Sequence, residues 1–152
     1  MVIRVLVAGI VGTIVSMTMG WLVWGMLLAN YFASQLTPAA KAVMSSQPRM
    51  IPLIAGNIGF GFFYAFVFEN WARVRSAASG LMAGAIMGFS IACIIDLMSD
   101  AFQVNFHVGS NTPPMLVDIL AGTIVGAIIG AAEGIVLGLM AKNTANTAAA
   151  EA

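Results

Sequence analysis

Four long apolar segments constrain the fold of this chain more than any other feature of its sequence. They cover residues 5–28, 51–68, 77–98 and 116–140. An α-helix rises about 1.5 Å per residue, so roughly 20 apolar residues are enough to cross the hydrocarbon core of a bilayer. The first segment is also longer than the apolar region of a signal peptide, and we expect it to be retained. The pattern predicts an all-α, four-transmembrane-helix bundle, with residues 1–140 forming a single domain.

The composition excludes a water-soluble domain and several classes of partner. Of the 152 residues, 61% are hydrophobic and 8% are charged, whereas about a quarter of the residues in soluble domains are charged. Six basic and six acidic residues cancel, so the chain offers no basic surface for nucleic acid. Cys93 is the only cysteine, so it cannot form an internal disulfide. The expected partner is the lipid bilayer, and nucleic acid is excluded.

The distribution of lysine and arginine predicts how the helices cross the membrane, because cytoplasmic loops are enriched in these residues. Four basic residues fall on one side of the predicted membrane and two on the other: Arg4, Arg73, Arg75 and Lys142 against Lys41 and Arg49. The connection between the third and fourth segments has no Lys or Arg. We therefore expect cytoplasmic N- and C-termini, and we place that connection outside.

Cap and turn signals predict the structure of the connections. Thr37-Pro38 is typical of an N-cap followed by proline at the first helical position, which predicts a short interfacial helix over residues 39–46. Apolar and polar residues alternate over residues 102–108, which predicts an extended segment at the membrane surface. Residues 141–152 are rich in Ala, Thr and Asn, and we expect them to form a disordered tail.

The two halves of the chain share a layout, since a proline precedes the second helix of each predicted hairpin. The corresponding sequences are Pro48-Arg49-Met50 and Pro113-Pro114-Met115. This layout favours a tandem repeat of two hairpins. At the end of the second span, Glu69 and Arg73 have the i,i+4 spacing of an ion pair.

Small residues recur at every fourth position of the spans and are the most specific feature of the sequence. Such ridges let helix backbones approach closely in lipid, where hydrophobicity supplies no attraction between helices. We expect these residues to form the helix contacts: Gly12, Ser16, Gly20, Gly80, Gly84, Gly88, Gly122, Gly126, Gly130, Gly134 and Gly138. The ridges predict either packing within one bundle or association in a homo-oligomer or with other membrane subunits. The sequence does not separate these two interpretations.

Continuing the ridges by the same step of four leads to polar residues near the outer ends of the spans. The residues reached in this way are Asn57, Asp96, Asp100 and Asp118. Carboxylates brought together repel unless they share a proton or a cation, which predicts a candidate proton or cation site with His107 as a further ligand. The alternative is structural, because carboxylates also satisfy free amides at helix starts or mark helix ends in headgroup water.

Glu133 lies inside the fourth span, about two turns from its cytoplasmic end. An ionised carboxylate at that depth is costly, so it must form an ion pair, bind a proton or reach water. The candidate partners on the same side are Arg4, Arg73 and Arg75. The two hypotheses are a structural ion pair and a role in ion or proton passage.

Three short motifs carry a resemblance: Gly20-Trp21-Leu22-Val23-Trp24-Gly25-Met26-Leu27-Leu28, Gly56-Asn57-Ile58-Gly59-Phe60-Gly61 and Leu116-Val117-Asp118-Ile119. With these motifs the chain resembles a bacterial family of four-helix inner-membrane proteins of unknown function, over most of residues 9–138. The resemblance implies a bundle in the inner (cytoplasmic) membrane of a bacterium. It implies no activity, because none is established for that family.

Sequence motifs of catalysis are missing, since no zinc-ligand spacing, nucleophile elbow or phosphate-binding loop occurs in the chain. We therefore expect a non-enzymatic membrane protein without a cofactor or a metal site. The leading hypothesis is a structural or accessory subunit that packs through its glycine ridges. The alternative is a small proton- or cation-handling transporter or channel that uses the intramembrane polar residues Asn57, Asp96, Asp100, Asp118 and Glu133.

Overall fold

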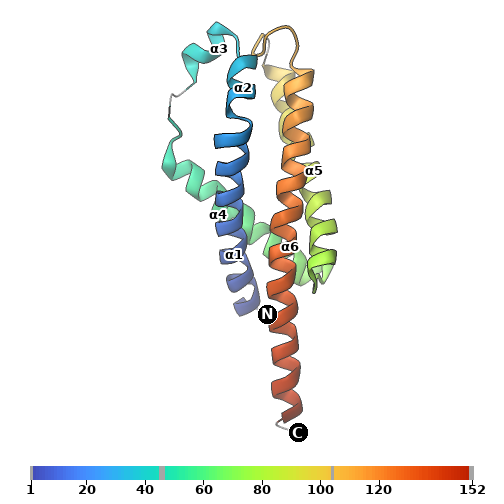
Figure 1. Cartoon of the computed structure of the whole chain (residues 1–152). Helices are drawn as coiled ribbons and strands as arrows, with labels where there is room; N and C mark the ends of the chain where they lie inside the picture. Colours follow the sequence, from blue (N-terminus) through green and yellow to red (C-terminus); the bar gives the residue numbers. More distant parts are fainter. Residues whose placement is uncertain (1, 45–46, 104, 151–152) are drawn as a thin grey trace.

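A computed structural model describes residues 2–44, 47–103 and 105–150 of the chain (Figure 1). The described part is helical and has no strand, which confirms the all-α class. Four helices are long and apolar enough to cross a membrane: Val2–Leu27, Met50–Ala72, Ala77–Phe102 and Thr112–Thr144. By length and composition, this is a multi-pass membrane protein with the four predicted spans.

The first span is a composite of two helical geometries. Helix α1 (Val2–Gly20) continues without a break into η1 (Trp21–Leu27), a π-helical segment. Helix α2 (Ala29–Gln35) follows directly, and α3 (Pro38–Val43) is the short helix predicted after the first span. Helix α3 ends before the predicted boundary at residue 46, and residues 45–46 lie outside the described residues.

The Thr37 side chain caps α3 as the sequence predicts, because it accepts a hydrogen bond from the backbone N–H of Ala40 at 3.2 Å. Pro38 occupies the first helical turn, where backbone N–H groups have no acceptor within the helix. Proline has no N–H, so no donor is left unpaired at this position. The sequence signal and the local structure therefore agree at this helix start.

The second span also changes geometry near its end. Helix α4 (Met50–Val67) continues into the π-helical η2 (Phe68–Ala72). Helices α5 (Ala77–Phe102) and α6 (Thr112–Ala150) form the last two spans. We expected residues 141–152 to be disordered, whereas α6 continues to Ala150, and residues 151–152 lie outside the described residues. The alanines that dominate this stretch have the highest helix propensity of all residues, which accounts for the continuation.

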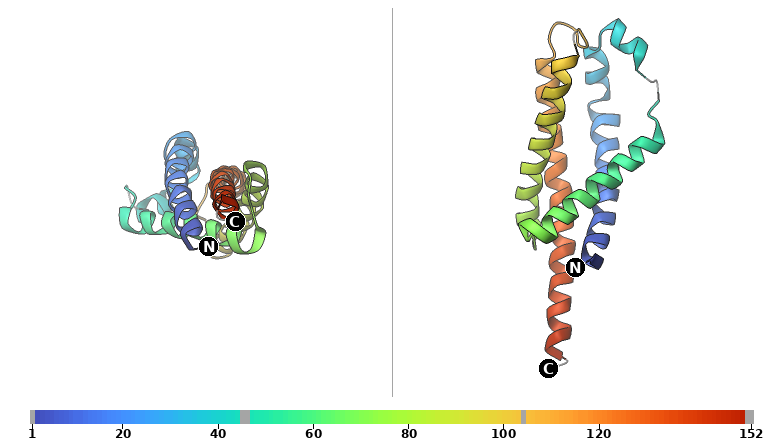
Figure 2. Two further views of the ribbon diagram at one scale, coloured as in Figure 1. Left: turned by 90° about the horizontal axis from the view of Figure 1, so that it is seen from below. Right: turned by 180° about the vertical axis from the view of Figure 1, so that it is seen from behind.

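The helices form two antiparallel pairs. Helix α5 packs along α6, and α1 packs on both α4 and α6, so that contacts between α1 and α6 join the pairs. Helix α4 is steeply inclined, and its N-terminal half diverges from the other three helices (Figure 2). The two termini lie toward the same end of the bundle, which we call the terminal end, and α6 projects beyond it (Figure 1). We call the opposite end, with α2 and α3, the loop end.

The connections meet at the loop end through backbone hydrogen bonds. Leu36 and His107 form an isolated antiparallel bridge. Next to it, the Thr37 N–H donates to the Phe106 carbonyl at 3.1 Å and the Val108 N–H donates to the Gln35 carbonyl at 2.7 Å. The segment after α5 is therefore extended where it pairs, as its alternating sequence predicts, although Val104 lies outside the described residues. This pairing ties the first hairpin to the second.

Candidate functional site

The glycine ridges of α5 and α6 face each other within one chain. A Cβ built at Gly80 would overlap the carbonyl of Gly130, and one built at Gly84 would overlap that of Gly126. Gly88 approaches the Gly122 carbonyl in the same way, so the residue numbers rise along α5 as they fall along α6. The two backbones are close enough that a methyl group at these glycines has no room.

The other predicted ridge residues have different neighbours. Gly134 and Gly138 pack on the backbones of Ser76 and Arg75, at the start of α5. Gly12 of α1 lies against Gly61 of α4 and against the carboxyl group of Glu133. The buried Ser16 hydroxyl donates a hydrogen bond to the Asn57 side chain. Gly20 contacts no other helix, because no described atom lies within 4 Å of a Cβ built there.

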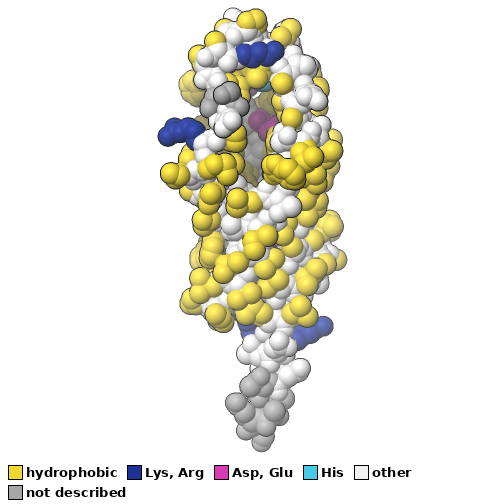
Figure 3. Space-filling model, turned by 60° about the vertical axis from the view of Figure 1, so that its left-hand side comes forward, with side chains coloured by type: hydrophobic (Ala, Val, Ile, Leu, Met, Phe, Trp, Pro, Cys, Tyr) yellow, Lys and Arg dark blue, Asp and Glu magenta, His cyan; other side chains and the backbone are white. Residues whose placement is uncertain are grey.

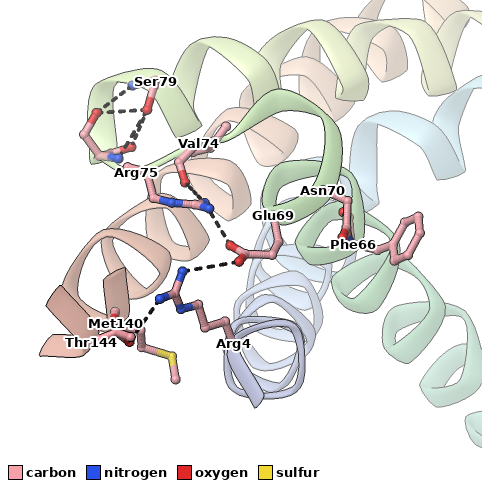
Figure 4. Close-up of polar contacts among 10 residues, drawn as sticks. Arg4, Phe66, Glu69, Asn70, Val74, Arg75, Ser79, Met140 and Thr144 are labelled. Atoms are coloured by element: carbon pink, nitrogen blue, oxygen red, sulfur yellow. Dashed lines mark hydrogen bonds and ion pairs between the residues drawn. The ribbon is translucent and has the colours of Figure 1, made fainter. Parts of the chain in front are cut away.

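Glu69 is the centre of an ion-pair cluster at the terminal end (Figure 4). Its side chain is 5% exposed and lies between two guanidinium groups, 3.4 Å from Arg4 Nη1 and 2.9 Å from Arg75 Nη1. Arg4 also donates a hydrogen bond to the hydroxyl of Thr144 on α6 at 3.0 Å. The cluster joins α1, η2, the connection before α5, and α6.

The predicted pair between Glu69 and Arg73 is wrong, and the backbone explains why. The helix ends at Ala72, and Arg73 has a left-handed conformation with φ of 49°. The i,i+4 relation between side chains holds only on a continuous α-helix, whereas this segment is π-helical and then reverses. Arg75 therefore takes the place predicted for Arg73, and Arg73 is exposed.

Glu133 is the most deeply buried charged residue described. Its exposed fraction is 0%, and neither carboxyl oxygen has a hydrogen-bond partner among the residues that the structure describes. The ion pair predicted with Arg4, Arg73 or Arg75 is not formed, because Arg4 and Arg75 bind Glu69 instead. Gly12 leaves the space that the carboxyl group fills, and Tyr64, also fully buried, lies near enough to interact with it electrostatically.

We expect Gly12→Ala to destabilise the bundle by about 1–3 kcal/mol, the usual cost of overpacking, because the new methyl group would overlap the Glu133 carboxyl group. In the Gly12→Ala/Glu133→Ala double variant that overlap is gone. The loss should therefore be at least about 0.5 kcal/mol smaller than the sum of the two single losses. Reversible unfolding in detergent, followed by circular dichroism, measures all four proteins. Additive losses would contradict the contact.

A cleft at the loop end collects the other acidic residues. Asp96, Asp100 and Asp118 line a cavity of about 290 Å³ together with Trp24, His107 and Asn111. Asp96 and Asp118 are near enough to form a hydrogen bond if one of them carries a proton. The indole N–H of Trp24 donates to Asp118, while Asp100 accepts a hydrogen bond from Asn111 at 2.6 Å. The predicted convergence of three carboxylates is therefore present in one cavity, where Asp96 and Asp118 adjoin each other and Asp100 is bound to Asn111.

His107 lines the same cavity as the aspartates, whereas Asn57 does not. Asn57 lines a second cavity, of about 350 Å³. Among the described residues that line it, Asp118 is the one acidic residue. The Asn57 amide N–H donates to the Leu53 carbonyl at 2.8 Å. His107 Nδ1 lies 2.9 Å from the Asn111 side-chain oxygen. The Asn57 side chain is bound to Ser16 of α1 and lies outside the cavity that Asp96 and Asp100 line.

Two residues of these clusters, Trp24 and Glu69, lie on π-helical segments, which no pattern in the sequence predicts. A π-helix has a wider turn than an α-helix and is frequent at functional sites. In η1 the π geometry accompanies the contact between Trp24 and Asp118, and in η2 that between Glu69 and the two arginines. The sequence places Trp24 in the first apolar span and in the motif of residues 20–28, and neither predicts its contact with Asp118.

The chemistry available to these groups is that of protons and cations. Within the described ranges no three His, Cys, Asp or Glu side chains are arranged to hold a metal ion. No family model, curated protein or solved structure matches the chain. The side chains and their contacts are therefore the basis for a proposed function.

Proposed function

We propose that this protein handles protons in the membrane as a small transporter, with Glu133 as the carboxyl group that binds and releases the proton. The observation that carries the proposal is that Glu133 is fully buried and that neither oxygen has a partner in the described part of the chain. An ionised carboxylate in such a place is costly, so the group is held as a neutral acid until it meets water. Acidic side chains inside membrane spans are commonly parts of proton relays.

The polar groups along α6 lie at three levels of the bundle, and their spacing sets what a proton path requires. Asp118 is about 22 Å from Glu133 along the helix axis, and Thr144, which contacts Arg4, is about 16 Å beyond it. These separations exceed hydrogen-bond reach, so a proton crosses them only through water or through movement of one helix pair against the other. The divergence of the N-terminal half of α4 from the other helices favours such movement.

The alternative of an accessory subunit that packs through its ridges has less support. The ridges of α5 and α6 pack against each other, so these glycines are not available to a second protein. For location we propose the inner membrane of a bacterium, with both termini in the cytoplasm. The basic residues Arg4, Arg73, Arg75 and Lys142 support that orientation.

Proton flux into liposomes tests the proposal. We expect the purified protein, reconstituted with a pH-sensitive dye inside, to acidify the lumen under an imposed membrane potential. Glu133→Gln should reduce that flux to the level of protein-free liposomes, and Glu133→Asp should retain part of it. Because Glu133 has no ion pair to lose, Glu133→Gln should fold normally. A folded Glu133→Gln protein with wild-type flux, or a wild-type protein without flux, would contradict the proposal.

A further inference from the structure

Two adjoining cavities lie in the loop-end half of the bundle, and Glu133, the proton-binding residue of the proposed function, lines neither of them. The cavity of about 290 Å³ is open near the loops, and the cavity of about 350 Å³ lies between α1, α4, α5 and α6. Trp24 and Asp118 line both cavities, so the two adjoin at these side chains, and we call them together the loop-end cleft. In the space-filling view acidic side chains are visible at the bottom of an opening between the helices (Figure 3).

One part of the loop-end cleft is acidic, and its one histidine, His107, is held by Asn111. Asp96, Asp100 and Asp118 line it, and no Lys or Arg occurs among its described lining residues. Asp96 Oδ2 is buried, and the described residues offer it no hydrogen-bond donor. Ionised carboxylates accept hydrogen bonds but cannot donate them, so Asp96 and Asp118 cannot satisfy each other. Their repulsion is relieved when a proton or another cation lies between them.

The other part of the cleft is mostly apolar, and its polar residues Ser16 and Asn57 are hydrogen-bonded to each other. Its walls are side chains of three helices: Phe60 from α4, Ile91 and Ile95 from α5, and Val125 and Ile129 from α6. Trp24 stands at the junction of the two parts, where its indole N–H is bound to Asp118. An apolar cavity with a few convergent polar groups at one end is the usual form of a site for a small organic molecule.

We propose that the loop-end cleft binds an amphipathic organic cation. An ammonium head lies beside Asp96 and Asp118, where Trp24 and Phe106 add aromatic groups that attract cations. The alkyl or aryl body extends along the apolar walls between α4, α5 and α6. The carboxylates exclude anions, and the apolar walls favour an organic cation over a hydrated metal ion. Binding does not depend on the proposed function, but describing this ligand as a transported substrate rests on it.

Tryptophan fluorescence can test binding at Trp24 itself. Trp21 and Trp71 are 65% and 72% exposed, so replacing both by phenylalanine leaves Trp24 as the only tryptophan without disturbing the core. We expect n-octylammonium to change the fluorescence of this protein in a saturable way, in discs of zwitterionic lipid. Octanol and octanoate have the same chain with a neutral or an anionic head, and they should not reproduce the saturable change.

Variants of the two aspartates connect binding to the acidic part of the cleft. Asp96→Asn and Asp118→Asn should each lower the affinity for octylammonium by about tenfold or more, because each removes a charged partner of the ammonium group. Asparagine keeps an oxygen that accepts from Trp24, so Asp118→Asn preserves that contact. Equilibrium dialysis with radiolabelled octylammonium checks the affinities independently of fluorescence. Equal responses to all three probes, or unchanged affinity in folded Asp96→Asn, would overturn the proposal.

The Glu133→Gln variant separates this proposal from the proposed function. We expect it to bind octylammonium with wild-type affinity although its proton flux is lost, since Glu133 is not among the residues that line the cleft. Saturable binding by a wild-type protein without proton flux would support the cleft and overturn the transport function. Proton flux without saturable binding would overturn the cleft proposal and leave the transport function intact.

Discussion

Replacing Gly130 by alanine is expected to destabilise the bundle by about 3 kcal/mol, at the upper end of the usual cost of overpacking. A Cβ at this position would overlap the Gly80 carbonyl group and would lie 2.8 Å from the Gly84 Cα. Both obstacles are backbone atoms, which cannot rotate away as a side chain can. Helix α5 as a whole would have to move from α6, and the other contacts of the ridge would open with it.

Gly59→Ala is the matched control for this substitution. Gly59 is also inside a transmembrane helix, but no described atom lies within 4 Å of a Cβ built there. Alanine has a higher helix propensity than glycine by up to about 1 kcal/mol, so Gly59→Ala should be neutral or slightly stabilising. Unfolding in detergent, followed by circular dichroism, compares both variants with the wild type under identical conditions.

The Gly126→Leu/Gly130→Leu double variant tests whether the same ridge has an intermolecular role. We expect it to lose its cooperative unfolding transition whatever the oligomeric mass of the wild type, because both glycines face α5 of the same chain. A double variant that stays folded but falls from a multimer to a monomer in detergent would contradict this arrangement. It would place the ridge between subunits.

The helices and their packing faces could be predicted from the sequence, whereas the partners of those faces could not. Runs of about 20 apolar residues identify the spans, and the step of four at Gly80, Gly84 and Gly88 identifies one face of α5. The periodicity of one helix does not indicate which other helix packs against its small-residue face. Gly12 shows this limit, because it belongs to a similar ridge but makes room for the Glu133 carboxyl group.

The sequence predicts which residues line the candidate site better than it predicts how they are arranged. The three aspartates line one cavity because they continue the faces through which α5 and α6 pack. Asn57 lines the other cavity, because its position depends on the tilt of α4. That tilt results from the packing of the whole bundle and is not encoded in the periodicity of one helix. Trp24 and Glu69 lie on π-helical segments, where the angular position of a side chain no longer follows 3.6 residues per turn.

Substituting Glu69 by glutamine is expected to destabilise the protein by about 2 kcal/mol. Removing one partner of a fully buried ion pair costs roughly 3–5 kcal/mol because a charge is left without compensation. Here the side chains of Arg4 and Arg75 are 20% and 34% exposed, so solvent screens part of that cost. Glutamine has nearly the same shape, and the loss therefore reports the charge and not the packing.

Arg73→Ala distinguishes this ion-pair cluster from the i,i+4 pair that the sequence predicts. If Glu69 is held by Arg4 and Arg75, removing the exposed Arg73 side chain should change the free energy of unfolding by less than about 0.5 kcal/mol. Arg75→Ala should cost more than Arg73→Ala, and it should cost little in a Glu69→Gln background, where the charge it compensates is gone. Equal losses from the two arginines, or an undiminished loss from Arg75→Ala in that background, would show that the cluster does not hold the helix pairs together.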